Sequence, residues 1–376
     1  MTALAPTVAP TSTALLGGSI AAFGLPGATT APAPAPLAEA TFDELLACCV
    51  SERITGHLIA VLDAAALPAT PTQRERAAHA HMRALARDLL LERLLVEVSS
   101  AFGAAGLEHR VLKGPVLAHT AYAAPELRSF ADIDVLVRGD DFDRAVGVLE
   151  AAGGRRKYAE PRPGFTQRFG KGVAISIGPL DVDLHRTLAP GPFGLTIALD
   201  DLFDTPPTRC RIGGRELHGL GATPRFLHAC VHAVLGDRIP RLVPLRDVGQ
   251  LALTTPLDLD DVLATAERWR CRAVVQRASR LARHALGLTT LGPLDEWATD
   301  YRADRFERSA LRSYVAPDRT YSLQAAAGVR ALRGVGARAA YIRAMVVPSA
   351  QYVRDRDGGY VRRLGRALRL GGRALR

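Results

Sequence analysis

The chain has few cysteines, few lysines and no long apolar run. Its 376 residues include five cysteines, an odd number with no CxxC pair, which argues against a disulfide framework and against a structural zinc site. No apolar stretch reaches the roughly 18 residues of a membrane helix, and no basic residue precedes the apolar N-terminal part. These absences support neither a membrane span nor a secretory signal. We therefore expect a protein of the reducing cytoplasm.

Nearly all basic residues are arginines, and many of them lie near the C-terminal end of the sequence. Of 48 basic residues only Lys113, Lys157 and Lys171 are lysines, and where arginine is so favoured a retained lysine indicates a need for a compact ammonium group. The net charge is +10, and the segment from Arg330 to Arg376 alone has twelve arginines against two aspartates. This tail could meet nucleic acid or an anionic membrane surface. It has few aromatic residues to stack on bases, so we favour a solvated helical face with a frayed end.

Composition divides the chain into four parts. Residues 1–40 are rich in Ala, Pro, Thr and Gly with no charge before position 39, which predicts a disordered leader. The hydrophobic pattern of residues 41–104 predicts N-terminal helices, and that of residues 105–222 predicts a small mixed α/β core. Residues 223–376 predict a helical domain that ends in the basic tail. A length of 376 residues also exceeds what one hydrophobic core usually serves. The predicted fold class is α+β.

Local signals place the elements within these parts. Thr41 is expected to cap a helix over 41–66, and a second amphipathic helix follows over 72–101. Two strands over 173–177 and 180–185 predict a hairpin with a Gly-Pro turn. In the C-terminal part we expect helices over 223–236, 244–254, 258–269, 272–287, 294–314 and 322–346.

Two predicted strands carry pairs of aspartates. The first, within residues 130–137, contains Asp132 and Asp134, and the second contains Asp181 and Asp183. Apolar residues occupy the alternate positions, so the acids of each strand point to one face. Carboxylates that share a face on neighbouring strands repel unless a cation lies between them. The pattern favours a Mg²⁺ site and phosphoryl chemistry, and the alternative is an edge strand whose acids face solvent.

These motifs carry a family resemblance. Over about residues 45–365 the chain resembles the bacterial uncharacterised nucleotidyltransferase family of the polymerase-β-like superfamily. The set of three motifs in this order is more specific than any one of them. The motifs are Val111-Leu112-Lys113-Gly114, Arg128-Ser129-Phe130-Ala131-Asp132-Ile133-Asp134 and Val182-Asp183-Leu184-His185.

The resemblance implies a fold and an activity. The fold is a small mixed-sheet nucleotidyltransferase core, flanked by the N-terminal helices and by the mostly helical C-terminal domain. The implied activity is transfer of a nucleoside monophosphate from an NTP to an unknown small-molecule or protein acceptor, with release of pyrophosphate. Asp132 and Asp134 match the acidic pair that binds two Mg²⁺ ions, and Asp183 matches the third acid. In-line attack on an α-phosphate needs one metal at the acceptor hydroxyl and one at the leaving group.

The chain also departs from the superfamily pattern. A Gly-Ser turn usually holds the triphosphate, whereas this chain has Lys113 and Gly114 followed by proline. Gly114 still permits close approach of a phosphate, and Lys113 can contact it as a point charge. Arg128 is a further candidate for phosphate binding, with a structural salt bridge as its alternative. Asp181 remains the alternative third ligand, and His185 is either a proton acceptor or hydrogen-bond donor at the site, or a strand-end histidine with satisfied hydrogen bonds.

Two other interpretations stay open at this point. His228 and His232 lie one helical turn apart, but no third zinc ligand is evident, so we expect them to pack in a helix core. The missing Gly-Ser turn also permits a non-catalytic nucleotide-binding or partner-regulating module on the same fold. A nucleic-acid binder that works through the arginine tail is the third functional alternative.

Overall fold

A seven-stranded mixed sheet forms the centre of the protein. The structure is a computed structural model that describes residues 12–28, 35–317 and 319–357. The strand order is β3-β4-β5-β2-β1-β7-β6. The strands are β1 (His109–Leu112), β2 (Ile133–Val137), β3 (Arg155–Arg156), β4 (Gly172–Ile177), β5 (Leu180–His185), β6 (Thr208–Ile212) and β7 (Arg215–Gly219).

The two acidic strands are direct neighbours. Strand β2 pairs with β5 in parallel, and the register places Asp134 opposite Asp183. On its other side β2 pairs with β1 in an antiparallel ladder. Strands β4 and β5 form the predicted hairpin, with Ile177 opposite Leu180. The sheet therefore brings together two acids that are 49 residues apart in the sequence (183 − 134 = 49).

Side-chain alternation gives the central strands two different faces. Ile133, Val135 and Val137 pack in one apolar cluster with β5 residues Val182 and Leu184. That cluster is completed by helices α4 (Pro71–Ala104) and α6 (Phe142–Ala151), which cover this face of the sheet. The acids occupy the alternate positions and so face away from α4 and α6. The predicted alternation is confirmed, and it directs the acids toward the helical half of the molecule.

The prediction of a disordered leader is wrong for residues 12–28. Helix α1 (Ser12–Ala22) packs against helices of the C-terminal half, and Ala21 and Ala22 are fully buried. The Arg246 guanidinium donates hydrogen bonds to the carbonyls of Ala21 (2.5 Å) and Phe23 (2.8 Å). Small side chains gave this segment the composition of a disordered region, but they also let its backbone approach other helices closely. Residues 1–11 and 29–34 of the predicted leader lie outside the described residues.

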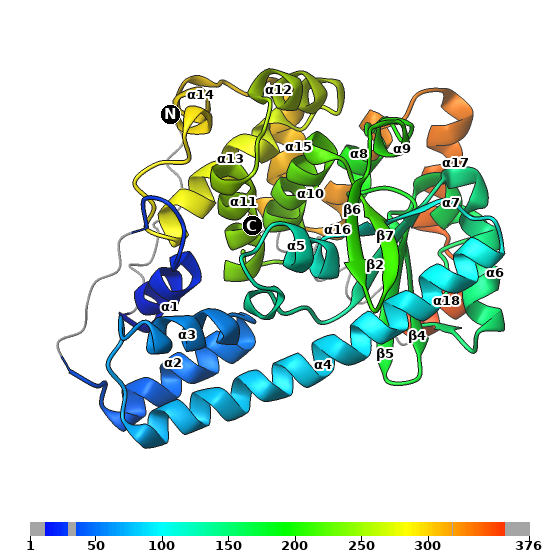
Figure 1. Cartoon of the computed structure of the whole chain (residues 1–376). Coiled ribbons are helices and arrows are strands. Elements are labelled where there is room, and N and C mark those ends of the chain that lie inside the picture. The colour runs from blue at the N-terminus through cyan, green and yellow to red at the C-terminus, as the bar shows by residue number, and fades with distance from the viewer. Residues whose placement is uncertain (1–11, 29–34, 318, 358–376) are drawn as a thin grey trace.

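The N-terminal helices differ from the expected boundaries. The expected helix over 41–66 is two helices, α2 (Glu39–Ser51) and α3 (Thr55–Asp63), and Thr41 is not its cap. The break between the two helices contains Glu52, which accepts a hydrogen bond from the backbone N–H of Leu242, a residue far away in the sequence (2.7 Å). Helix α4 is 34 residues long and extends from these helices to the sheet (Figure 1).

The C-terminal part is helical, as expected, but more finely divided. The expected helices over 294–314 and 322–346 are each two helices, and none of the described helices is long and apolar enough to cross a membrane. Together with the mixed sheet, these helices confirm the α+β class. The helices are α10 (Ala222–Leu235), α11 (Leu242–Thr254), α12 (Leu259–Arg268), α13 (Arg272–Ala285), α14 (Pro293–Asp300), α15 (Arg305–Val315), α16 (Tyr321–Ala331), α17 (Val335–Val346) and α18 (Ala350–Asp357). Short helices within the core are α5 (Gly114–Thr120), α7 (Phe165–Phe169), α8 (Gly191–Gly194) and α9 (Asp201–Asp204).

The packing of α1 on α13 generates a stability prediction. A Cβ atom at Gly18 would lie 2.2 Å from the Ala285 carbonyl oxygen, so Gly18→Val must push the two helices apart. We expect a loss of about 1–3 kcal/mol in the free energy of unfolding, measured by urea denaturation. Leu15→Val is the control, because Leu15 lies on the same helix and is 59% exposed. Equal stability of the two variants would contradict the docking of α1.

Candidate active site

A lysine ammonium lies between the two acids of the first strand. Lys113 Nζ is 2.9 Å from Asp134 Oδ2 and 4.0 Å from Asp132 Oδ1. Asp134 is buried in β2, whereas Asp132 precedes the strand and its side chain is 32% exposed. Both carboxylates therefore reach one cation, as expected for acids on a common face.

The turn that carries Lys113 has an unusual backbone. Lys113 follows β1 and precedes α5 with φ of +31° and ψ of −138°, a conformation that L-residues with side chains rarely adopt. Gly114 follows with φ of +37°, which glycine accepts without a steric penalty. The turn brings the Lys113 side chain into the site while the glycine starts α5. The structure thus places Lys113 and Gly114 together beside the acids.

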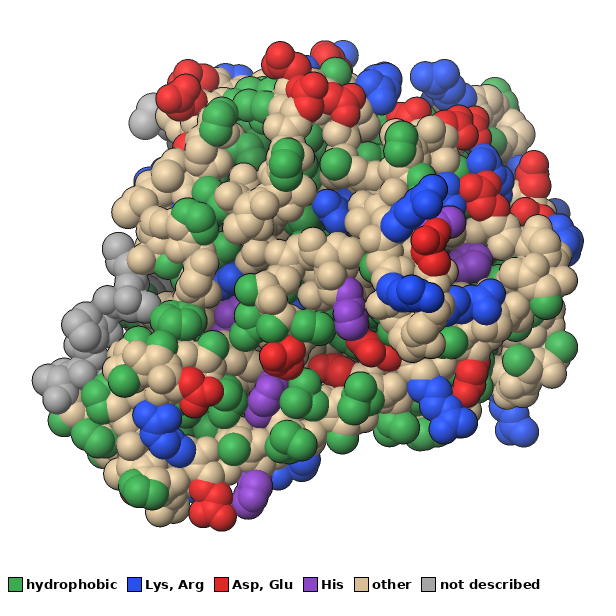
Figure 2. Space-filling view, in the orientation of Figure 1, with side chains coloured by type: hydrophobic (Ala, Val, Ile, Leu, Met, Phe, Trp, Pro, Cys, Tyr) green, Lys and Arg blue, Asp and Glu red, His purple; other side chains and the backbone are tan. Residues whose placement is uncertain are grey.

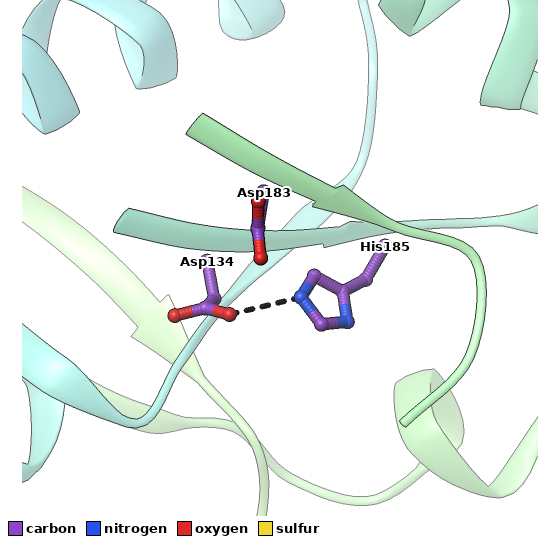
Figure 3. Close-up of side chains that lie close together, drawn as sticks. All are labelled: Asp134, Asp183 and His185. Carbon is purple, nitrogen blue, oxygen red and sulfur yellow. Dashed lines mark hydrogen bonds and ion pairs between the residues drawn. The ribbon is translucent and has the colours of Figure 1, made fainter. Parts of the chain in front are cut away.

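Asp134, Asp183 and His185 converge on one point from two strands (Figure 3). One ligand atom from each of them lies within 4.8 Å of the others. The His185 Nε2 atom is hydrogen-bonded to Asp134 Oδ1 at 2.9 Å, and its Nδ1 atom is 3.3 Å from the Thr187 carbonyl oxygen. A neutral imidazole has one N–H, and the shorter of the two distances assigns it to Nε2, which donates to the Asp134 carboxylate. His185 thereby fixes the orientation of Asp134.

Burial and charge shift the pKa values of this group in different directions. Burial would raise the pKa of Asp134, but the Lys113 ammonium and the His185 ring hold it well below its usual range. Burial and the neighbouring Asp134 charge raise the pKa of Asp183. Burial and the Lys171 charge lower the pKa of His185. Asp134 is therefore the fixed anion of the site, and Asp183 is the carboxyl group that can exchange a proton.

All three lysines of the chain lie along the acidic strands. Burial lowers the pKa of Lys171, although the charges of Asp134 and Asp183 act in the opposite direction, and Lys171 lines the same hollow as Asp183. Lys157 donates to Asp181 at 2.7 Å, and the Ser176 hydroxyl donates to the other oxygen of Asp181 at 2.9 Å. Both Asp181 oxygens are thus engaged away from Asp134, which supports Asp183 as the third acid. We did not assign Lys171 to the site from the motifs, although the scarcity of lysine was a signal that pointed to it.

Arg128 is committed to a buried ion pair. Its Nε and Nη2 atoms donate to the two carboxylate oxygens of Asp247, at 3.1 and 2.7 Å. The Tyr122 hydroxyl also donates to Asp247, at 2.7 Å. Arg128 and Asp247 are both fully enclosed, and the bidentate geometry occupies the guanidinium edge that a phosphate would need. The structure thus supports the alternative of a structural salt bridge, which ties the loop before β2 to helix α11.

Helix α10 covers the site with two histidines. His228 is buried and His232 is half-buried; their ring centroids lie 6.4 Å apart, and His232 Nε2 lies 3.5 Å from Lys113 Nζ. Burial and neighbouring charges hold the pKa of each imidazole well below its usual range, so both are neutral. With Lys113 they line a cavity of about 10 Å³, which has room for about one water. The prediction of helix-core packing missed that this part of the core borders the site.

A second hollow opens on the hairpin side of the acids. It has a volume of about 210 Å³ and is lined by Lys171, Asp183 and His185, together with backbone and apolar side chains of β4 and β5. This hollow gives a molecule from solvent access to the Asp183 carboxylate. Helix α10 therefore covers the acids on one side, and a molecule from solvent can reach Asp183 on the β4 side.

The residues fit a hard divalent cation. Carboxylate oxygens are the ligands that Mg²⁺ prefers, and Asp134 and Asp183 present such oxygens toward one point. Asp132 lies outside that convergent group but shares the Lys113 ammonium with Asp134. Because Lys113 is already within ion-pair distance of Asp134, it would share this carboxylate with any bound metal.

The raised pKa of Asp183 generates a pH prediction. A divalent cation needs the ionised carboxylate, and a raised pKa keeps the group protonated above its ordinary value of 3.8. We expect the affinity for Mg²⁺ to fall by up to about tenfold per pH unit as the pH drops below this raised pKa. Titration calorimetry at several pH values measures the slope. Asp183→Asn should remove it and Asp181→Asn should keep it, whereas the same slope in all three proteins would contradict the assignment.

The chain is similar to proteins of known structure. Two similar solved structures are the crystal structure of ANT(2'')-Ia in complex with adenylyl-2''-tobramycin and the solution structure of the antibiotic-resistance factor ANT(2'')-Ia. The first is 16% identical and covers 48% of this chain and 98% of its own, with a TM-score of 0.34. The second is 18% identical and covers 51% and 98%, also with a TM-score of 0.34. No curated protein sequence matches the chain.

A family model gives the wider relationship. The model described as uncharacterised nucleotidyltransferase matches residues 38–287, which is more than half of the chain. The matched stretch contains the Lys113 turn, both acidic strands and helix α10. The chain belongs to this uncharacterised nucleotidyltransferase family.

Proposed function

We propose that the protein is a Mg²⁺-dependent nucleotidyltransferase that moves a nucleoside monophosphate from an NTP to an acceptor and releases pyrophosphate. The observation that carries this proposal is the parallel register of β2 and β5, which sets Asp134 opposite Asp183 with their oxygens beside His185. Family membership supports the reaction class. The donor would be an NTP, and the acceptor a small molecule or a protein side chain.

The acids are the proposed metal and catalytic residues. Asp134 and Asp183 would hold one Mg²⁺, and Asp132 with Asp134 would hold a second. When bound, the metals supply charge neutralisation at the phosphates and activation of the acceptor hydroxyl. His185 keeps the Asp134 carboxylate in one orientation through its 2.9 Å hydrogen bond. A residue held in this way loses little freedom when a ligand binds.

Asp183 is the proposed proton acceptor. It borders the open hollow on the β4 side, and burial together with Asp134 raises its pKa. Without a bound cation, this raised pKa makes Asp183 a stronger base than an ordinary aspartate. An acceptor hydroxyl that enters from the hollow would meet this carboxylate first. We place the acceptor on this side and the NTP phosphates on the side of the Lys113 turn.

The phosphates would be held by Lys113 and Gly114 rather than by a Gly-Ser turn. Lys113 supplies a point charge beside the acids, and Gly114 offers backbone without a side chain at the start of α5. Lys171 would add a second ammonium from the β4 side, since it lines the same hollow as Asp183. Arg128 has no part in this role, because Asp247 occupies its guanidinium edge. Two of the three lysines of the chain would thus hold the phosphates.

The two alternative functions, a non-catalytic module and a nucleic-acid binder, differ from a nucleotidyltransferase in nucleotide consumption and in surface charge. A non-catalytic module on the same fold would bind nucleotide without consuming it. On the face drawn in Figure 2, basic side chains are interspersed with acidic ones and form no continuous basic surface for nucleic acid. Much of the arginine tail, residues 358–376, lies outside the described residues. The proposed setting is the cytoplasm, where NTP and Mg²⁺ are available.

Activity measurements separate the third acid from its neighbour. We expect Asp183→Asn to lower nucleotidyl transfer by at least about 100-fold, because it removes both the proposed base and a metal ligand. Asp181→Asn should change the rate by less than about threefold, since exposed ion pairs such as Asp181 with Lys157 contribute little. The assay follows each α-labelled NTP with Mg²⁺ and a lysate of small molecules and proteins.

The reference for this assay is Asp134→Asn, which should be inactive. If Asp134→Asn leaves metal-dependent nucleotide consumption unchanged, the catalytic proposal fails and the non-catalytic module is favoured. If Asp181→Asn is the inactive variant and Asp183→Asn is not, the third acid has been misassigned.

A further inference from the structure

Five arginine side chains line one hollow that is separate from the acidic site. Arg268 and Arg270 come from the end of α12 and the turn after it, while Arg330, Arg333 and Arg338 come from the α16–α17 junction. The hollow has a volume of about 500 Å³, and no acidic residue lines it. We call it the arginine pocket.

Two of these arginines have firm partners that fix their positions. Arg268 donates through Nη2 to Asp201 at 3.1 Å, and among the described residues it is the only one of the five that faces a carboxylate. The Arg270 guanidinium lies over the Phe306 ring, 5.0 Å from its centroid. Stacking on a ring positions a guanidinium but leaves its charge and its N–H edge available.

The three arginines of the α16–α17 junction have only neutral partners or none. Arg330 Nη1 is 3.4 Å from a serine hydroxyl, and Arg338 Nε donates to the Leu332 carbonyl at 3.0 Å. Within the part of the chain that the structure describes, no hydrogen bond or ion pair of the Arg333 side chain is found. These three exposed arginines therefore line one hollow without any carboxylate to balance their charge. An anionic ligand would relieve the repulsion between them.

The walls of the pocket are held together before any ligand binds. Thr196, on the segment after α8, donates its hydroxyl hydrogen bond to the Trp269 carbonyl at 2.8 Å, and α16 packs directly on α8. Trp269 is fully buried, so this bond anchors the α12 side of the pocket to the core. A preformed pocket spends little binding energy on ordering its side of the complex.

We propose that the arginine pocket binds a small molecule that carries at least two phosphate groups. Guanidinium groups match phosphate oxygens with paired N–H bonds, and five of them exceed what one phosphate can engage. The volume suits a small-molecule ligand. A single-stranded nucleic acid would need exposed aromatic rings to stack on, and the ring beside the pocket, Phe306, is covered by Arg270.

The pocket is independent of the nucleotidyl-transfer site in sequence as well as in space. Arg330, Arg333 and Arg338 lie beyond residue 287, where the family match ends. The chain therefore builds half of this pocket from helices that the family model does not include. No lysine contributes to it, in contrast to the acidic site, where Lys113 pairs with Asp134 and Lys171 lines the hollow beside Asp183.

The test is calorimetric titration of the full chain with inorganic tripolyphosphate, in the presence of a chelator. The pocket variant combines Arg330→Gln, Arg333→Gln and Arg338→Gln. We expect it to lose one saturable binding event, with affinity at that site reduced by more than about tenfold. The control combines Arg83→Gln, Arg93→Gln and Arg155→Gln, which removes the same charge from exposed positions outside the pocket. The control should bind as the wild type does.

Each outcome decides the proposal. Equal losses in the two triple variants would show general charge attraction and overturn it. Pocket-dependent binding of an oligonucleotide that exceeds tripolyphosphate binding would overturn it in favour of nucleic acid. If the pocket triple variant fails to fold, Arg333→Gln alone replaces it, because Arg333 is exposed, and a loss of about threefold is then expected. No turnover is measured, so a failure of the proposed transferase activity would leave this result unchanged.

Discussion

The ion pair between Lys113 and Asp134 is the interaction on which the site depends. Two parallel neighbouring strands place carboxylates opposite each other, and such an arrangement is unstable in a buried setting without positive charge. The chain supplies that charge through Lys113, 2.9 Å from Asp134, and through Lys171 nearby. The site is thus already balanced by the protein itself, and a bound metal would enter an existing arrangement of charges.

The helical half completes this arrangement by covering the lysine side of the site and by fixing positions. Helix α10 places neutral His228 and His232 against the lysine side of the site, so no further cation competes for the acids there. Helix α11 contributes Asp247, whose ion pair with Arg128 fixes the loop that leads into β2. The two halves of the chain therefore function as one unit at the acids, although composition suggested separate domains.

The sequence predicted the acidic strands well because a period of two is a local property. Asp134 and Asp183 could each be assigned to one face of their own strand without knowledge of the neighbouring strand. The family motifs indicated that the two acids belong to one site. The role of Arg128 could not be predicted, because its partner Asp247 lies 119 residues away and ion pairing depends on the tertiary fold. The same holds for α1, whose order depends on Arg246 and on close packing at Gly18 rather than on its own composition.

The most direct measurement is a crystal structure with Mn²⁺ and a non-hydrolysable NTP analogue, with the metal located by its anomalous signal. The account predicts a peak bound by carboxylate oxygens of both Asp134 and Asp183, with the analogue's phosphates next to Lys113. A metal bound elsewhere, or an analogue whose phosphates avoid the Lys113 turn while both acids stay without metal, would contradict it.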